Sequence, residues 1–147
     1  MKIYYLCTFI ILSILSINSS FAGGVGYVDY NKVLSNYQYA KIAMTEVENK
    51  GIEIEKYLEA KEEEYNKTES AVQKKKIEET VKQEMFTKEQ AFQDFKAKKE
   101  EDVFNRIHVV SEKIRMEKGL DAILDIRSVF SGGVDITNDL IKKLNEK

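Results

Sequence analysis

Proline is absent from the whole chain, and this absence constrains the fold more than any other feature of the sequence. Between Gln38 and Met116 the chain contains only one glycine, Gly51, and Glu, Lys, Ala and Gln dominate. These four residues are strong helix formers, whereas proline and glycine interrupt helices. A run of this length without a break predicts long helices or a coiled coil rather than a compact globular core.

The apolar residues of this region recur every three or four positions, which is the heptad spacing of helices that pack side by side. The first stripe comprises Val47, Gly51, Ile54, Leu58, Lys61, Tyr65, Thr68 and Val72. The second comprises Val81, Met85, Lys88, Phe92, Phe95 and Lys99, then slips by one position to Val103, Ile107, Val110 and Ile114. We call the two stripes together the seam.

The two stripes mirror each other about a point near residue 75. In this mirror Leu58 pairs with Phe92 and Tyr65 pairs with Met85. The pattern predicts an antiparallel helical hairpin with its turn at residues 71–76, although an antiparallel dimer of unbroken helices would give the same pairs. Each arm of the hairpin would reach about 50 Å at 1.5 Å per residue.

The first residues have the pattern of a secretory signal. Lys2 precedes an apolar run over residues 3–17, and the small residues Ser20 and Ala22 fit a cleavage site. We therefore expect residues 1–22 to be a signal peptide and the mature chain to start near Gly23. An uncleaved membrane anchor is the alternative, but the run is shorter than the ~20 residues that a spanning helix needs.

The remaining chain has no cysteine, because Cys7 lies in the signal segment. An exported protein without disulfides or a His/Cys metal cluster must be stabilised by packing or assembly. Without Lys2, 22 basic residues face 25 acidic ones, so the net charge is about −3 and both signs are interspersed. This excludes the concentrated basic face of a dedicated nucleic-acid binder. The length predicts one domain, residues 23–147.

The two ends differ in character from the middle. At the start, residues 26–28 predict a short strand, and Asp29 can cap a helix that begins at Tyr30. After Gly119, residues 120–125 and 128–130 each predict a strand. A turn at 132–133 and a last helix capped by Thr137 follow.

The predicted fold is therefore mainly α. Residues 38–116 form a long antiparallel hairpin arm on a small β body made from residues 23–37 and 117–147. Because so few strands rarely form a stable sheet alone, we expect the strands to be shared among subunits.

The end segments resemble the Skp/OmpH family of periplasmic chaperones. The resemblance is carried by GYVDYNKVL at 26–34, DAILD at 121–125, GGVDIT at 132–137 and LIKKLN at 140–145. It implies a trimer with a small β body and three helical arms that enclose a cavity. It also implies ATP-independent capture of unfolded outer-membrane β-barrel proteins in the periplasm, without any cofactor.

The chain departs from the best-known members of this family, since it is mildly acidic where they are strongly basic, and its arms are shorter. The first departure leaves contact with lipopolysaccharide or an anionic membrane open. The alternative function is a structural or adaptor coiled coil of the cell envelope that does not handle unfolded proteins.

No catalytic or metal site is predicted. His108 lies beside the seam without a Ser or Cys nucleophile to serve, so we interpret it as a solvated helix position. The acidic runs at 62–64 and 78–79 place neighbouring carboxylates in different directions around a helix, as a solvated face does.

Two groups of residues are candidates for binding. Lys74, Lys75 and Lys76 would form a basic tip of the hairpin that could touch anionic lipid or an acidic client. Four aromatic or apolar residues just off the seam either widen the packed stripe or line the cavity as client contacts: Ile52, Tyr57, Phe86 and Phe104.

Overall fold

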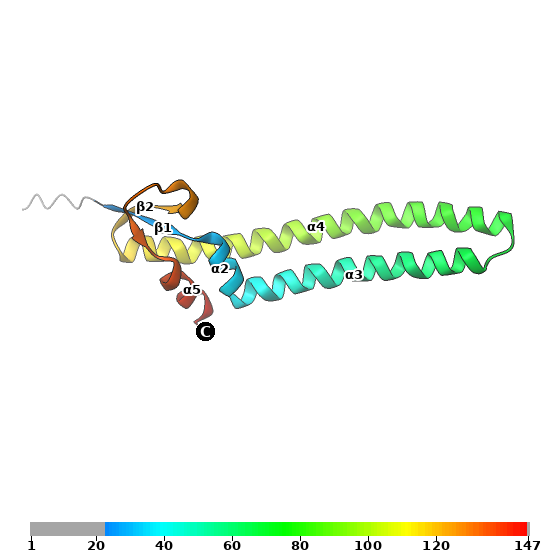
Figure 1. The fold of residues 1–147 in the computed structure, drawn as a ribbon, viewed down its shortest axis with the longest axis horizontal. Helices are drawn as coiled ribbons and strands as arrows, with labels where there is room; N and C mark the ends of the chain where they lie inside the picture. The colour runs from blue at the N-terminus through cyan, green and yellow to red at the C-terminus, as the bar shows by residue number, and fades with distance from the viewer. Residues whose placement is uncertain (1–22, 147) are drawn as a thin grey trace, which may run out of the picture.

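The computed structural model describes residues 23–146, and the predicted signal peptide, residues 1–22, lies outside them. The chain forms a small body at one end and a long two-helix arm that projects from it (Figure 1). The elements are β1 (Gly24–Val28), α2 (Tyr30–Asn36), α3 (Gln38–Lys67), α4 (Ala71–Glu117), β2 (Leu120–Asp125), the 3-10 helix η1 (Ile126–Ser128), β3 (Val134–Asp135) and α5 (Thr137–Asn145).

The body is a three-stranded, all-parallel sheet in the order β2-β1-β3. The N-terminal strand therefore lies between two C-terminal strands, as the prediction of a body built from both ends requires. Gly26 in β1 is needed for this pairing, because a Cβ there would lie 2.8 Å from the Leu120 side chain. The predicted strand at 120–125 is confirmed.

The predicted strand at 128–130 is wrong. Asp125 instead accepts a hydrogen bond from the backbone N–H of Arg127 at 2.9 Å and caps η1, so the chain turns away from the sheet. The third strand is Val134–Asp135, which is too short to read from a sequence. It forms because it pairs with Gly26 and Tyr27 of β1.

The core of the body lies where the sheet meets α2, α5 and the end of α4. Its most deeply buried side chains are Val33, Ile114, Ile136, Leu140 and Thr137. The Thr137 hydroxyl accepts a hydrogen bond from the backbone N–H of Asp29 at 3.0 Å, which ties the end of β1 to the start of α5. Thr137 is thus not the N-cap of α5; it lies inside the helix, and its N–H donates to the Asp135 carboxylate at 2.9 Å.

The start of α3 depends on a residue from the other end of the chain. Tyr37, at the N-cap position, makes no side-chain cap. The Asn145 side chain accepts a hydrogen bond from the Gln38 N–H at 2.9 Å and donates one to the Asn36 carbonyl at 3.0 Å. By contrast, Asp29 caps α2 locally, as predicted, by accepting from the Lys32 N–H at 2.9 Å.

The arm is an intramolecular hairpin, which confirms the predicted antiparallel pairing within one chain (Figure 1). Its turn, however, lies at residues 68–70 and not at 71–76, because Ser70 begins α4 as its N-cap. The Ser70 hydroxyl accepts from the Gln73 N–H at 3.4 Å. Ser-x-x-Gln is a helix-start signal in the sequence, and it marks the turn.

The earlier turn shifts the pairing of the two helices by one heptad. Phe92 faces Gly51, with its ring 3.9 Å from where a Gly51 Cβ would be, rather than Leu58. The seam itself is largely correct, since its members from Val81 to Ile114 are half-buried or buried. Two members are wrong: Tyr57 takes the place of Leu58, and Val72 is exposed because it follows the turn.

Packing weakens along the arm from the body to the tip. Close to the body Ala40, Ala43, Val103 and Ile107 are buried. Between residues 44 and 102 every side chain is half-buried or exposed. Polar contacts join the helices there, such as the ion pair between Lys99 and Glu46. The outer arm is therefore held by less apolar burial than its base.

A hydrogen-bonded cluster reinforces the base. The Tyr39 hydroxyl of α3 donates to the Asp102 carboxylate of α4, and the Arg106 guanidinium lies 4.1 Å from the Tyr39 ring centroid. The Tyr39 hydroxyl, and then Arg106, lower the pKa of Asp102, while the same carboxylate raises the pKa of Tyr39. Both shifts favour the bonded pair near neutral pH.

We expect Gly51→Ala to stabilise the protein by up to about 1 kcal/mol, because alanine is the better helix former and its Cβ would meet Phe92 at an ordinary contact distance. Urea unfolding followed by circular dichroism measures this. The control is Gly133→Ala, which should destabilise, since Gly133 has φ +92° and a Cβ there would lie 2.9 Å from the Val25 carbonyl oxygen. Destabilisation by Gly51→Ala would contradict the loose packing of the arm.

We expect Asn145→Ala to cost about 1 kcal/mol of unfolding free energy, as loss of a helix cap usually does. Hydrogen exchange should also show faster exchange of the Gln38 amide, which loses its acceptor. Glu146→Ala, one position further on, is the matched control and should change neither value. An unchanged Gln38 exchange rate in Asn145→Ala would refute the capping role.

Candidate client-binding groove

An apolar groove lies at the base of the arm, where α2, α3 and α4 meet, and has a volume of about 790 Å³. Tyr30 and Leu34 of α2 and the small residues Ala40 and Ala43 of α3 line it from the body side. The helix order places these residues together, because α2 and α3 meet at a bend at Tyr37 and α4 returns alongside α3. Apolar side chains make up most of the lining, to which Val47, Val103 and Phe104 also contribute.

Two large side chains stand at the open side of the groove. Met44 of α3 is 63% exposed and Phe104 of α4 is 55% exposed, and both line it. Phe104 stacks at 6.1 Å between ring centroids on the exposed His108, one turn further along α4. Exposed side chains of this size beside an apolar hollow are typical of a binding surface.

Charged groups surround the apolar lining. Glu48, Glu100 and Glu101 contribute carboxylates, and Lys96 and Lys99 contribute ammonium groups. Burial, and then the charge of Glu100, raise the pKa of the Tyr30 hydroxyl, so Tyr30 is neutral and can serve as an amphipathic contact. The groove is therefore apolar within and charged at its edge.

The structure separates the four client-contact candidates. Phe86 and Phe104 are 18 positions apart on α4, which is five full turns, so both point to the side of the hairpin that holds the groove. Phe86 is 66% exposed and lies about 27 Å further out along the arm, at 1.5 Å per residue. These two candidates share one face.

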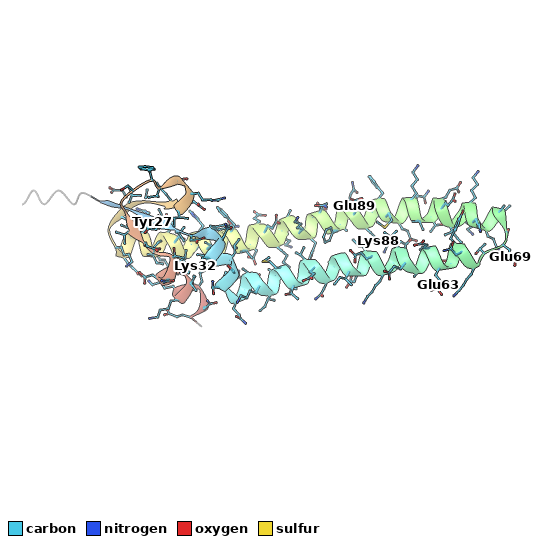
Figure 2. All side chains as sticks on the ribbon, viewed as in Figure 1. Tyr27, Lys32, Glu63, Glu69, Lys88 and Glu89 are labelled. Atoms are coloured by element: carbon cyan, nitrogen blue, oxygen red, sulfur yellow. The ribbon has the colours of Figure 1, made fainter. Side chains whose placement is uncertain are left out.

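The other two candidates are Tyr57 and Ile52. Tyr57 turns into the hairpin, where the Lys88 Nζ of α4 lies 4.5 Å from its ring centroid. Figure 2 shows Lys88 between the two arm helices. Its buried hydroxyl has no hydrogen-bond partner among residues 23–146, and burial, then Glu84, raise its pKa. Ile52 lies one turn beyond Glu48 on α3 and, like Phe86 on α4, follows a seam residue by one position, so it points outward on the groove's side of the hairpin.

The predicted basic tip is not at the turn. Lys74 sits one turn into α4, where its Nζ lies 4.8 Å from the ring centroid of Tyr65 in α3. Lys75 and Lys76 are exposed on the same part of α4. Glu69 occupies the turn itself, and Glu63 and Lys67 pair beside it (Figure 2). The tip region thus carries both signs of charge.

Sequence reasoning missed Met44 and the groove. Met44 lies off the seam, and the residues that lie beside it in the groove come from other helices, so the periodicity of α3 alone does not mark it. Its exposure matters only because α2 and α4 place Tyr30 and Phe104 beside the same hollow. Within residues 23–146 no three His, Cys, Asp or Glu side chains gather as metal ligands would.

Comparison with known proteins agrees with these features. A protein-family model described as "Outer membrane protein (OmpH-like)" matches residues 24–144. A search of curated proteins finds no match. In the described part of the chain no helix is long and apolar enough to cross a bilayer. Members of the matched family are periplasmic chaperones of outer-membrane proteins and not enzymes. The resemblance of the end segments is confirmed, and the chain belongs to the OmpH-like outer membrane protein family.

Proposed function

We propose that this protein is an ATP-independent periplasmic holdase that binds unfolded outer-membrane β-barrel proteins between its arms and prevents their aggregation. The observation that carries the proposal is the apolar groove at the arm base, on the same face as the exposed rings of Phe86 and Phe104. Membership of the OmpH-like family supports the client class.

Holding requires contact area and no chemistry. An unfolded barrel protein exposes alternating apolar residues and unpaired strand edges, which otherwise pair with other chains. A face with widely spaced apolar contacts can cover such a segment without selecting one sequence. The weak packing between residues 44 and 102 supports arms that adapt to clients of different size.

The sheet of the body supports assembly with further copies. All-parallel sheets are almost always covered on both faces, but among residues 23–146 helices cover only one. Along β1, Gly26 and Val28 face the core, while Val25, paired with Ala122, and Tyr27, paired with Leu124, face the other way. We propose that this second face packs against other copies in a homo-oligomer, with the trimer that the family resemblance implies.

Contact of Lys75 and Lys76 with anionic lipid or lipopolysaccharide is a secondary proposal. Both side chains are exposed, but the neighbouring acidic residues around the turn weaken the attraction. Co-sedimentation with anionic vesicles tests it directly.

We expect the double substitution Phe86→Ser and Phe104→Ser to weaken the holdase. Each ring that leaves water on binding contributes on the order of 1 kcal/mol, so half-maximal suppression of aggregation should need at least about tenfold more protein. The assay dilutes a urea-unfolded barrel protein into the protein and records light scattering.

Ile42→Ser is the matched control and should behave as the wild type, because Ile42 is 50% exposed but flanks the buried Ala43 on the side away from the groove residue Met44. If the double variant keeps full activity with its fold intact, the face is wrong. If the wild type itself fails to suppress aggregation at a stoichiometric ratio, the adaptor function is favoured.

We expect Leu124→Glu to dissociate the oligomer, because it puts a charge on the uncovered sheet face. Light scattering after size-exclusion chromatography should give about one third of the wild-type mass if the assembly is the trimer. Leu58→Glu is the control, since Leu58 on the arm is 39% exposed and Leu124 is 40% exposed. A wild-type monomer, or equal masses for wild type and Leu124→Glu, would refute assembly through this face.

A further inference from the structure

We propose that the groove at the arm base binds apolar client segments that are flanked by Lys or Arg, in preference to segments flanked by Asp or Glu. This inference rests on the proposed holdase function and adds to it the charge class of the bound segment. The groove supplies two features for this choice, an apolar lining that one apolar side chain or a few could fill, and carboxylates at its edge.

Some carboxylates near the groove edge form ion pairs with lysine side chains, and others do not. Lys99 is engaged by Glu46, and Lys96 lies 3.9 Å from Glu100. Glu48 and Glu101 line the groove but form no ion pair with any residue of 23–146. Two carboxylates, one on each arm helix, are thus left to meet a cation from outside.

The two carboxylates stand on the tip side of the Met44 and Phe104 side chains, one on each arm helix, because α3 and α4 run antiparallel. Glu48 follows Met44 by one turn of α3, and Glu101 precedes Phe104 by about one turn of α4. A polypeptide whose apolar side chain enters between Met44 and Phe104, and whose chain continues toward the tip, would therefore bring flanking residues close to both carboxylates. Lysine and arginine side chains suit this position, because their long stems can lie along apolar surface while the charge reaches the carboxylate.

The whole chain carries a net charge of only −2, so long-range attraction contributes little to this preference. Selection must come from contacts at the groove edge, which salt screens only in part when the bound segment covers them. An unfolded chain that presents an acidic flank would meet Glu48 and Glu101 as like charges.

Two fluorescein-labelled peptides with the same alternating apolar centre test the proposal, one flanked by lysines and the other by glutamates. Fluorescence anisotropy with the wild-type protein should show about three- to tenfold tighter binding of the lysine-flanked peptide, the range expected for one or two exposed ion pairs. Glu48→Gln with Glu101→Gln should abolish the difference while both peptides still bind. Glu48→Lys with Glu101→Lys should reverse it.

The matched control carries the same charge reversal near the tip, Glu62→Lys with Glu63→Lys, and should keep the wild-type preference. Equal binding of the two peptides, or a preference that changes equally in the tip variant, overturns the proposal. The same proteins are assayed for suppression of barrel-protein aggregation. Suppression without a peptide preference sinks this inference alone, whereas loss of suppression in the wild type sinks the holdase function.

A second copy of the chain is the competing occupant of the groove. Met44→Ser with Phe104→Ser distinguishes the two, because it should weaken both peptides and leave the mass in solution unchanged. A fall in mass to the monomer would show that the groove is part of a subunit interface and would overturn the proposal.

Discussion

The insertion of β1 between β2 and β3 is the constraint on which the rest of the molecule depends. Parallel strands cannot be joined by a tight turn, so the chain leaves the sheet at the C-terminal end of β1 and must return at the opposite end, where β2 begins beside Gly24. Here that connection holds α2, α3 and α4, and α4 is long enough to run back past the body to the start of β2 (Figure 1). The pairing works because Gly26 lets Leu120 approach closely. The C-terminal segment then closes the body, with Thr137 bound to Asp29 and Asn145 bound to the start of α3.

The sequence predicts the hairpin well because periodicity is a property of each helix alone. The half-buried stripe of α4 coincides with the predicted seam from Val81 to Ile114. The register, meaning which residue of α3 lies opposite which residue of α4, is a property of the pair of helices. Heptad repeats determine the register poorly, because a shift of seven residues again places seam against seam. The correct register depends on the turn, and the turn depends on the cap at Ser70 and Gln73. That signal is short and polar, and it contains neither of the residues, glycine and proline, that usually mark a turn.

Only part of the candidate site could be predicted from the sequence. Phe86 and Phe104 could be chosen because they are large apolar residues just off the seam. The sequence pattern placed Tyr57 just off the seam as well. In the structure the seam of α3 passes through Tyr57 instead of Leu58, so the Tyr57 ring lies against Lys88 inside the hairpin. The groove could not be predicted either, because it arises from three helices brought together by the body. The short strand Val134–Asp135 could not be predicted either, because it forms only by pairing with β1, which is far away in the sequence.

The position of the groove has a mechanical consequence for the proposed holdase. Tyr30 and Leu34 belong to α2, which is fixed to the body core by Val33, whereas Met44 and Phe104 belong to the arm. A segment bound in the groove would contact the body and both arm helices together. Because apolar packing between the arm helices weakens beyond Ala43 and Val103, such a segment would add burial at the point where the arm begins to loosen. A client could then bias the direction of an arm whose tip it does not touch, by favouring the arrangement that closes the groove around it.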